Sequence, residues 1–167
     1  MDKIESLGKA EAKILGDMQE IVSTIRGLSA HDVKDAQHGV LLLREIRLSV
    51  YENLNQIQHE YLILRGLRWL CDNGFESHIE WEWNPRQTGD ADEPDLRGIR
   101  DGRILISAEA TASENPIGTV DARMSQTLEK LNTMQGQRFY FVSTDRMAQR
   151  ARTKANKRNW SIKVVQV

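Results

Sequence analysis

The sequence predicts an α/β protein in which an N-terminal α-helical hairpin precedes a mixed β-sheet flanked by helices. Residues 4–57 repeat apolar side chains every three or four positions, as amphipathic helices do. Residues 75–167 instead place short strand-like segments between helical ones. Because three strands in succession are followed by strand–helix units, we expect antiparallel and parallel pairing in one sheet, with helices on both faces.

The composition of the chain is that of a folded protein of modest size. Its 167 residues are 40% apolar and 28% charged, which is enough apolar material for a core in one domain with a helical extension. The sequence lacks both a run of about 18–20 apolar residues and the apolar stretch of a signal peptide, so we expect a cytoplasmic protein without a membrane partner. The single cysteine, Cys71, excludes an intramolecular disulfide and a cysteine-rich zinc site.

Two helices with coiled-coil spacing are predicted in residues 1–57, which we assign to a first domain. Gly27 and Ser29 supply a helix stop and an N-cap between the two helices. The surplus apolar residues Leu42 and Ile46 indicate packing either on the rest of the chain or on another molecule, and we expect a homodimer formed through this hairpin. The apolar stripes are Ile4, Leu7, Ile14, Met18, Ile21, Ile25 and Leu28 in the first helix, and Val33, Ala36, Val40, Leu43, Val50, Leu54 and Ile57 in the second.

A second domain is predicted over residues 58–167. Its helices are expected at 58–73, 119–135 and 145–159, and its strands at 75–83, 96–100, 103–112, 138–143 and 161–167. Residues 84–93 form a polar loop that contains Pro85 and Gly89 and is followed by Pro94, and Asp101-Gly102 is a hairpin signal. Trp81 and Trp83 share one face of a strand, which favours a position in the core over stacking on nucleic-acid bases.

Two acidic residues on neighbouring predicted strands could hold a metal ion. Asp95 follows Pro94, and Glu109 lies near the end of the next strand, with thirteen residues between the two acids. Two carboxylates can hold Mg²⁺, which supplies a nucleophile at neutral pH and relieves the charge on a phosphodiester. Strand alternation places Asp95 on the same face as Glu109 only if the turn has a three-residue loop, 100–102, or a β-bulge of equal effect. We predict one of these, with Gly102 in the left-handed conformation.

The Asp95 and Glu109 pattern, together with the element order of about residues 58–167, resembles the PD-(D/E)xK nuclease superfamily of the restriction-endonuclease-like fold. The resemblance implies that both acids bind a divalent cation, Mg²⁺ or Mn²⁺, and that the residue two positions after the second acid helps to generate the attacking hydroxide. The family has a lysine there, whereas this sequence has Thr111. Some members move the lysine to a neighbouring helix, which makes Lys130 the candidate replacement.

Glu60 is a further candidate for the metal site. Helical spacing places it in line with Leu64 and Leu67, and an acid on an apolar stripe is costly unless a cation or a basic residue such as Arg65 compensates it. Many members of the resembled family carry an additional metal-site glutamate on the helix before the first strand, which implies the same role for Glu60. Both alternatives remain open, and His59 is expected at the surface or in a supporting position.

The charge distribution indicates where nucleic acid could bind. The whole chain has 23 basic and 24 acidic residues, which argues against a protein that simply coats nucleic acid, yet residues 146–163 contain seven bases and no acid. The helix predicted there could contact phosphates, the alternative being an ordinary solvated face. The expected DNA-binding residues are Arg146, Arg150, Arg152, Lys154, Lys157 and Arg158.

These observations lead us to expect a homodimeric Mg²⁺-dependent endonuclease of the restriction or phage-encoded kind that hydrolyses DNA, with RNA as the alternative substrate. One rival is a nuclease fold that has lost catalysis and binds DNA or a protein partner, which the threonine at position 111 favours. A second rival is an adaptor whose purpose lies in the coiled-coil hairpin. The sequence has no glycine-rich phosphate-binding loop, so nucleotide-dependent enzymes of that kind are not expected.

Overall fold

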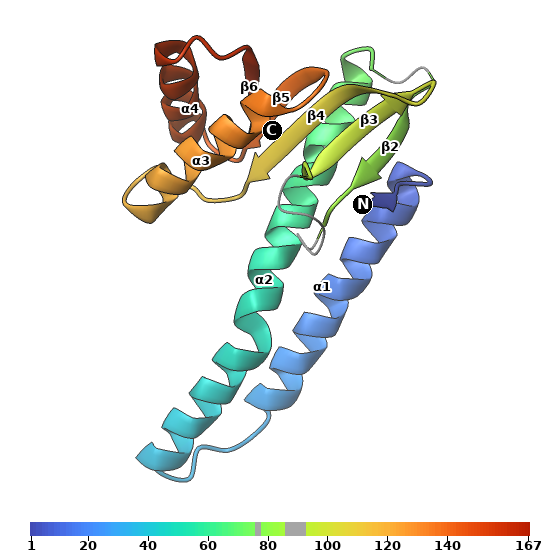
Figure 1. The fold of residues 1–167 in the computed structure, drawn as a ribbon. Helices are drawn as coiled ribbons and strands as arrows, with labels where there is room; N and C mark the ends of the chain where they lie inside the picture. The colour runs from blue at the N-terminus through green and yellow to red at the C-terminus, as the bar shows by residue number, and fades with distance from the viewer. Residues whose placement is uncertain (76–77, 86–92) are drawn as a thin grey trace.

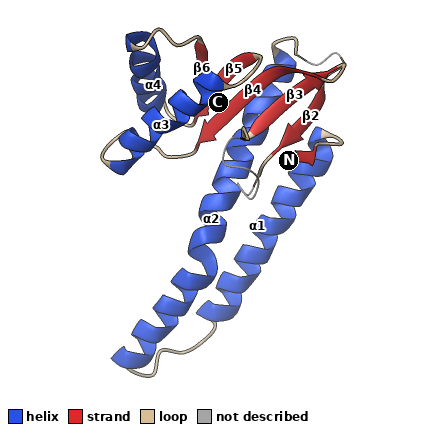
Figure 2. Cartoon of the chain, in the orientation of Figure 1, coloured by secondary structure: helices blue, strands red, loops and turns tan. Residues whose placement is uncertain are grey.

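The computed structural model describes residues 1–75, 78–85 and 93–167, apart from the side chain of Glu52. An N-terminal hairpin of helices projects from a sheet that carries further helices, as Figures 1 and 2 show. Most of the polar loop predicted at 84–93 lies outside the described residues. The elements are β1 (Asp2–Lys3), α1 (Leu7–Ser29), α2 (Ala36–Asp72), β2 (Glu80–Trp83), β3 (Leu96–Arg100), β4 (Arg103–Thr111), α3 (Thr119–Thr133), β5 (Gln137–Val142), α4 (Asp145–Lys157) and β6 (Ile162–Gln166).

Both helices of the hairpin begin at a side-chain cap. The Ser6 hydroxyl accepts a hydrogen bond from the backbone N–H of Lys9, and the Asp35 carboxylate accepts one from the N–H of His38. The prediction that the second helix is capped by Ser29 was wrong, because Ser29 is the last residue of α1 and Asp35 provides the cap. Helix α2 then continues without a break from the hairpin into the body of the protein, so the predicted domain boundary after residue 57 falls inside it.

The apolar stripe of α1 packs as predicted, whereas that of α2 does not. Ile14 and Ile21 of α1 share a buried cluster with Val50 and Ile57 of α2, and Ile46 packs against it. The prediction was wrong for the part of the α2 stripe near the tip of the hairpin. There Val40 and Leu43 are exposed, and the neighbouring Leu42 and Ile46 are partly buried instead. The apolar side chains that this leaves exposed on α2 are Val40, Leu41, Leu43, Leu48, Tyr51 and Leu54.

The six strands form one mixed sheet in the order of the chain. Strands β1 to β4 pair antiparallel, and β4, β5 and β6 pair parallel, which confirms the expected combination. Strand β1 was not predicted, because its two residues are too few to show a periodicity. The strand predicted at 75–83 was too long: β2 begins at Glu80, and His78 has a φ of 60°, which an extended strand does not accommodate.

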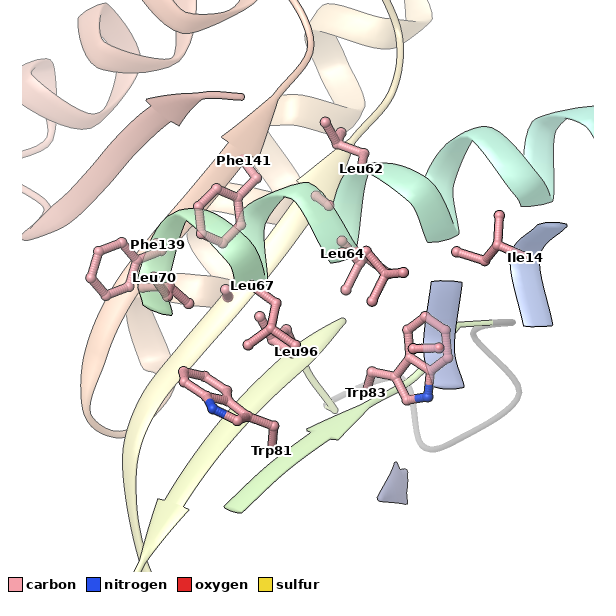
Figure 3. Close-up of a cluster of buried hydrophobic side chains, with 14 of the residues drawn as sticks. Ile14, Leu62, Leu64, Leu67, Leu70, Trp81, Trp83, Leu96, Phe139 and Phe141 are labelled. Atoms are coloured by element: carbon pink, nitrogen blue, oxygen red, sulfur yellow. The ribbon is translucent and has the colours of Figure 1, made fainter. Parts of the chain in front are cut away.

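Helices cover both faces of the sheet, and each face has its own core. Phe139 and Phe141 of β5 pack in the cluster with α2, whereas Tyr140 and Val142 pack with α3 and α4. Figure 3 shows the first cluster, in which ten of the side chains are labelled. Trp81 and Trp83 are among these labelled side chains, and both are buried, which confirms the prediction of core positions and leaves them unable to stack on bases.

A bulge sets the register between β3 and β4. Arg100 pairs with Arg103 across Asp101-Gly102, and both turn residues have positive φ, 53° and 72°, as a two-residue turn of this hand requires. The alternative of a three-residue loop was therefore wrong. The alternative of a bulge is confirmed, because the register shifts by one residue and leaves Leu105 without an opposite partner.

The consequence of the bulge reaches the start of β3. Leu96 pairs with Ala108, so the preceding Asp95 lies beside Glu109 instead of Ala108. The two acids thereby share one side of the strand pair, as the expected metal site requires. The left-handed conformation predicted for Gly102 is also confirmed.

Candidate functional site

Two buried carboxylates meet at one edge of the sheet. Because β3 and β4 are antiparallel, the start of β3 and the end of β4 lie together, and this brings Asp95 next to Glu109. Strand β4 also contacts α2 and α3, so helices approach the same edge (Figure 1). Asp95 and Glu109 are 3% and 4% exposed, respectively, which is far less than acidic residues usually are.

Asp95 is held from two sides. Its Oδ2 accepts a hydrogen bond from the backbone N–H of Ala110 at 2.8 Å, and its Oδ1 lies 3.3 Å from His59 Nε2. His59 projects from α2 and is largely buried, with 15% of its side chain exposed. Burial opposes protonation of this imidazole, but the carboxylates of Asp95, Glu109 and Glu60 outweigh it and raise the pKa of His59. Of the two positions expected for His59, at the surface or in support of the site, the structure shows the second, because the imidazole is largely buried against Asp95.

Glu109 faces a lysine from the neighbouring helix. Its Oε1 lies 2.9 Å from Nζ of Lys130 on α3, and the same ammonium group donates a hydrogen bond to the carbonyl oxygen of Glu93 at 2.7 Å. Burial, and then the charge of Asp95, raise the pKa of Glu109 to about 8 against the opposing effect of Lys130 and His59. The structure thus brings the predicted residues Asp95, Glu109 and Lys130 together and adds His59 to them.

The donor atoms of this cluster suit a hard divalent cation. Glu109 Oε1 and His59 Nε2 are buried and make no well-directed hydrogen bond, although each lies close to an opposite charge. Mg²⁺ commonly uses one or two carboxylates and retains water, whereas zinc sites use three or four protein ligands. Within the described ranges, no group of three or more histidine, cysteine, aspartate or glutamate side chains is placed to hold a metal ion. Two carboxylates are the number and type of ligand that Mg²⁺ or Mn²⁺ commonly uses, and fewer than zinc sites use.

Thr111, at the position where the resembled family has a lysine, has its hydroxyl held by a tyrosine. The Thr111 hydroxyl accepts a hydrogen bond from the Tyr140 hydroxyl at 2.7 Å. Burial raises the pKa of Tyr140 to about 12, so the phenol stays protonated and donates. Thr111 therefore contributes a fixed hydroxyl beside Glu109 and no base.

Glu60 has a basic partner from the hairpin. It is 1% exposed, and its Oε2 lies 2.8 Å from Lys13 Nζ on α1. Gln56 donates a longer hydrogen bond of 3.4 Å to the other carboxylate oxygen. Of the two explanations left open by the sequence, the structure provides the basic partner, but it is Lys13 and not Arg65. The role of Glu60 as an auxiliary metal ligand stays a prediction.

The bases of α4 mainly attach this helix to α3. Arg150 and Lys154 lie 2.7 and 3.0 Å from the carboxylate of Asp121, and their hydrogen bonds hold the pKa of Asp121 below its usual range. Arg158 lies 3.8 Å from Glu129. The remaining predicted residues are Arg146, which donates to the Asn115 side chain, Arg152, which donates to the carbonyl of Val164, and the exposed Lys157. Contact of these six residues with DNA stays a prediction.

Comparisons of the chain with protein-family models, curated proteins and solved structures find no match. In the part of the chain that the structure describes, no helix combines the length and the apolar character needed to cross a membrane. The geometry of the buried carboxylate cluster is therefore the starting point for a function.

Proposed function

We propose that this protein is a Mg²⁺-dependent endonuclease that hydrolyses DNA phosphodiester bonds, built on a restriction-endonuclease-like fold. The observation that carries the proposal is the meeting of two buried carboxylates, Asp95 and Glu109, with the ammonium group of Lys130 at one edge of a mixed sheet. Two acids buried side by side are costly without a compensating cation, and binding sites often retain such a cost. The order of four antiparallel strands, β1 to β4, followed by the parallel strands β5 and β6 supports the proposed fold.

In this proposal Asp95 and Glu109 hold the cation. Mg²⁺ would supply a Lewis acid for the phosphate and a bound water of lowered pKa. Mn²⁺ can replace it, because it accepts the same oxygen ligands. The hydrogen bond from Ala110 fixes the Asp95 carboxylate before any ligand arrives, which spares the site a rearrangement on binding.

Lys130 takes the part that the strand residue has in the resembled family. Its ammonium is placed at Glu109 and anchored to the Glu93 carbonyl, so it can orient a water molecule or stabilise negative charge on phosphate oxygens. Thr111 lacks this chemistry, since its hydroxyl carries no positive charge and is held by the hydrogen bond from Tyr140. His59 acts through Asp95 and is a positioning residue in this scheme.

A homodimer formed through the hairpin belongs to the same proposal. The exposed apolar side chains of α2 recur at helical spacing, as in Leu41 and Leu48, with the charges of Arg44 and Glu45 on either side of this pair. A second copy of the helix offers the same stripe and the opposite charges, which is what a two-fold interface needs. One site per chain cuts one strand, so two copies would cut both.

Sedimentation equilibrium tests the dimer. We expect Leu41→Glu combined with Leu48→Glu to give a monomer of unchanged helix content. Ile117→Glu, which changes an exposed residue outside the hairpin, should leave the mass unchanged. A monomeric wild-type protein at micromolar concentration would contradict the dimer.

The cleavage proposal is tested on supercoiled plasmid DNA with Mg²⁺ or Mn²⁺. We expect nicking by the wild-type protein, loss of nicking in Glu109→Gln and Asp95→Asn, and no change in Glu129→Gln, an exposed acid on α3. Titration with Mn²⁺ followed by electron paramagnetic resonance should show weaker binding in the same two variants. DNA that is retarded but uncut would favour the inactive binding protein, and an absence of both effects would favour the adaptor.

A further inference from the structure

A groove lies beside the carboxylate cluster, between α2 and the segments that follow β4 and β5. Its volume is about 590 Å³, within the usual range for pockets that bind small molecules, and it is large enough for one nucleotide. Gln58 of the groove is the neighbour of His59 in the chain. Ala112, which also lines it, is three residues beyond Glu109, or about 10 Å along an extended strand.

We infer that this groove binds an unpaired nucleotide of the DNA strand, one or two positions from the phosphate that is cut, with Tyr61 as the stacking surface and Arg65 as the phosphate contact. The inference rests on the proposed nuclease function and names its substrate class: DNA with a single-stranded stretch. Intact duplex does not offer such a nucleotide, because its bases are stacked on one another and paired. Enzymes that need access to a base pay a few kcal/mol, roughly, to unstack it from a duplex.

Tyr61 and Arg65 combine the two contacts that single strands require. They are one helical turn apart on α2 and both line the groove, and the Tyr61 side chain is 50% exposed although it is aromatic. Arg65 is exposed and forms no ion pair with any residue that the structure describes. Aromatic side chains that stack on bases, next to free basic groups that follow the backbone, are typical of proteins that bind single strands.

The wall of the groove opposite α2 is fixed by side-chain hydrogen bonds. The Ser143 hydroxyl lies 3.2 Å from the carbonyl oxygens of both Ala112 and Ser113, and the Thr144 hydroxyl donates to the carbonyl of Glu114 at 2.8 Å. These bonds tie the segment after β4 to the segment after β5. The groove is therefore formed before a ligand binds, which lowers the cost of ordering on binding.

A second groove continues the path on the other side of the same segment. It has a volume of about 440 Å³ and shares Asn115 with the first groove. Arg146, one of the predicted DNA-binding residues, lines it and donates to the Asn115 side chain at 3.3 Å. The first groove carries Arg65 together with the acid Glu114, and the second carries Arg146, so a strand that leaves Arg65 along this segment next meets a second basic side chain.

Fluorescence anisotropy with labelled oligonucleotides tests the inference. The probes are a 12-nucleotide single strand of DNA, its duplex and the RNA of the same sequence, all with Ca²⁺ in place of Mg²⁺. We expect the single strand of DNA to bind more tightly than the duplex, and Tyr61→Leu to weaken its binding about tenfold, which is the usual size of one stacking contact. Arg65→Gln should weaken binding and reduce the slope of log Kd against log salt by about 0.7.

Matched variants on the same helix serve as controls. Tyr51→Leu removes a tyrosine that is 58% exposed outside the groove and keeps an apolar side chain there, and Arg68→Gln removes an exposed arginine of α2 outside the groove and outside the proposed dimer stripe; neither should change binding. Equal losses in Tyr61→Leu and Tyr51→Leu, tighter binding of the duplex, or preference for the RNA would overturn the inference. Circular dichroism of each variant checks that α2 is intact.

The outcome for the groove is separable from that for the nuclease. If wild-type protein cuts DNA and Asp95→Asn does not, but Tyr61→Leu binds and cuts as well as wild type, the groove assignment fails and the nuclease stands. If no variant or metal gives cleavage while binding of the single strand still depends on Tyr61, the nuclease fails and the groove stands.

Discussion

Lys130 Nζ on α3 lies 2.9 Å from Glu109 Oε1 on β4, so a helix supplies the ammonium group that the strand lacks at position 111. The two residues are 21 positions apart in the chain, and the parallel crossover from β4 to β5 through α3 brings them together. Glu109 is buried beside a second acid, and the ammonium partly compensates its charge. The same arrangement leaves the lysine next to the place where a cation would be bound.

Removal of the lysine should affect cleavage far more than removal of the threonine hydroxyl. We expect Lys130→Met to lower the nicking rate by about 10² or more, the usual effect of a positioned proton-transfer or charge-stabilising group. Thr111→Val should have a small effect, because that hydroxyl is engaged by Tyr140. Initial nicking rates at saturating Mg²⁺ measure both, with Lys34→Met, an exposed lysine of the hairpin, as the control. A larger loss in Thr111→Val would assign the catalytic role to the strand.

The stability of the metal-free protein should fall as the pH rises. The pKa of Glu109 is raised from 4.5 to about 8, so the folded state retains a proton that the unfolded state releases between these values, and stability is lost across that window. The raised pKa of His59 acts in the same direction above pH 6.5. Each group contributes a slope of at most about 1.4 kcal/mol per pH unit.

Urea unfolding in EDTA between pH 5 and pH 9 measures this slope. Glu109→Gln should be less pH-dependent than wild type and more stable than it at pH 8.5, because its amide has no charge to bury. Addition of Mg²⁺ should flatten the wild-type profile as well. Parallel profiles for the two proteins would show that Glu109 is charged throughout.

Lys13 should be needed mainly because Glu60 is buried. Lys13→Met leaves the Glu60 carboxylate, which is 1% exposed, without its cation at 2.8 Å. Because Lys13 itself is 39% exposed, we expect a loss of about 2 kcal/mol, below the 3–5 kcal/mol typical of fully buried pairs. Glu60→Gln in the Lys13→Met background should restore most of the lost free energy of unfolding. Lys9→Met, which removes an exposed pair with Glu5, should cost under about 1 kcal/mol. Additive effects in urea unfolding of the double variant would contradict the coupling.

Gly66 should be required by the close approach of α2 to the sheet. A Cβ at this position would lie 2.5 to 2.7 Å from the ring of Phe141, so one of the two elements would have to move. We expect Gly66→Ala to lower the free energy of unfolding by about 1–2 kcal/mol, since overpacking exceeds the gain of about 1 kcal/mol in helix propensity. Gly16→Ala, where nothing lies within 4 Å, should be neutral or stabilising in the same thermal-unfolding experiment.

Periodicity and turn chemistry were sufficient to predict most helices and strands, because the chain follows local preferences over long segments. The strand at 103–111 is an example. It is mostly apolar and directly follows the Asp101-Gly102 turn, so a strand is the element that its sequence favours. The start of α2 was missed because both Ser29 and Asp35 are good N-caps, and sequence offers no way to rank them. The face of α2 was missed because it depends on the crossing with α1, which has no local signal.

In the candidate site, too, the residues could be chosen from local patterns, whereas their spatial arrangement could not. Asp95 and Glu109 could be selected from their spacing, but the bulge at Leu105 that aligns them could be given only as one of two alternatives. Lys130 was selected through the family resemblance, and the structure places it at Glu109. A supporting position for His59 could be given only as one of two alternatives, and Lys13 was missed, since their contacts join α2 to Asp95 and α1 to α2, and such long-range contacts leave no pattern along a helix.

Helix α2 connects the tip of the hairpin to the carboxylate cluster as one continuous rod. From Ala36 to His59 the rise is about 35 Å at 1.5 Å per residue. In a dimer joined near the tip, the length of α2 would set the distance between the two carboxylate clusters. It would therefore also set the separation of the two cuts. Insertion of one heptad into both α1 and α2 would lengthen each arm by about 10 Å without rotating the tip much relative to the sheet. The spacing of breaks on opposite strands would then change while the chemistry at each site stayed the same.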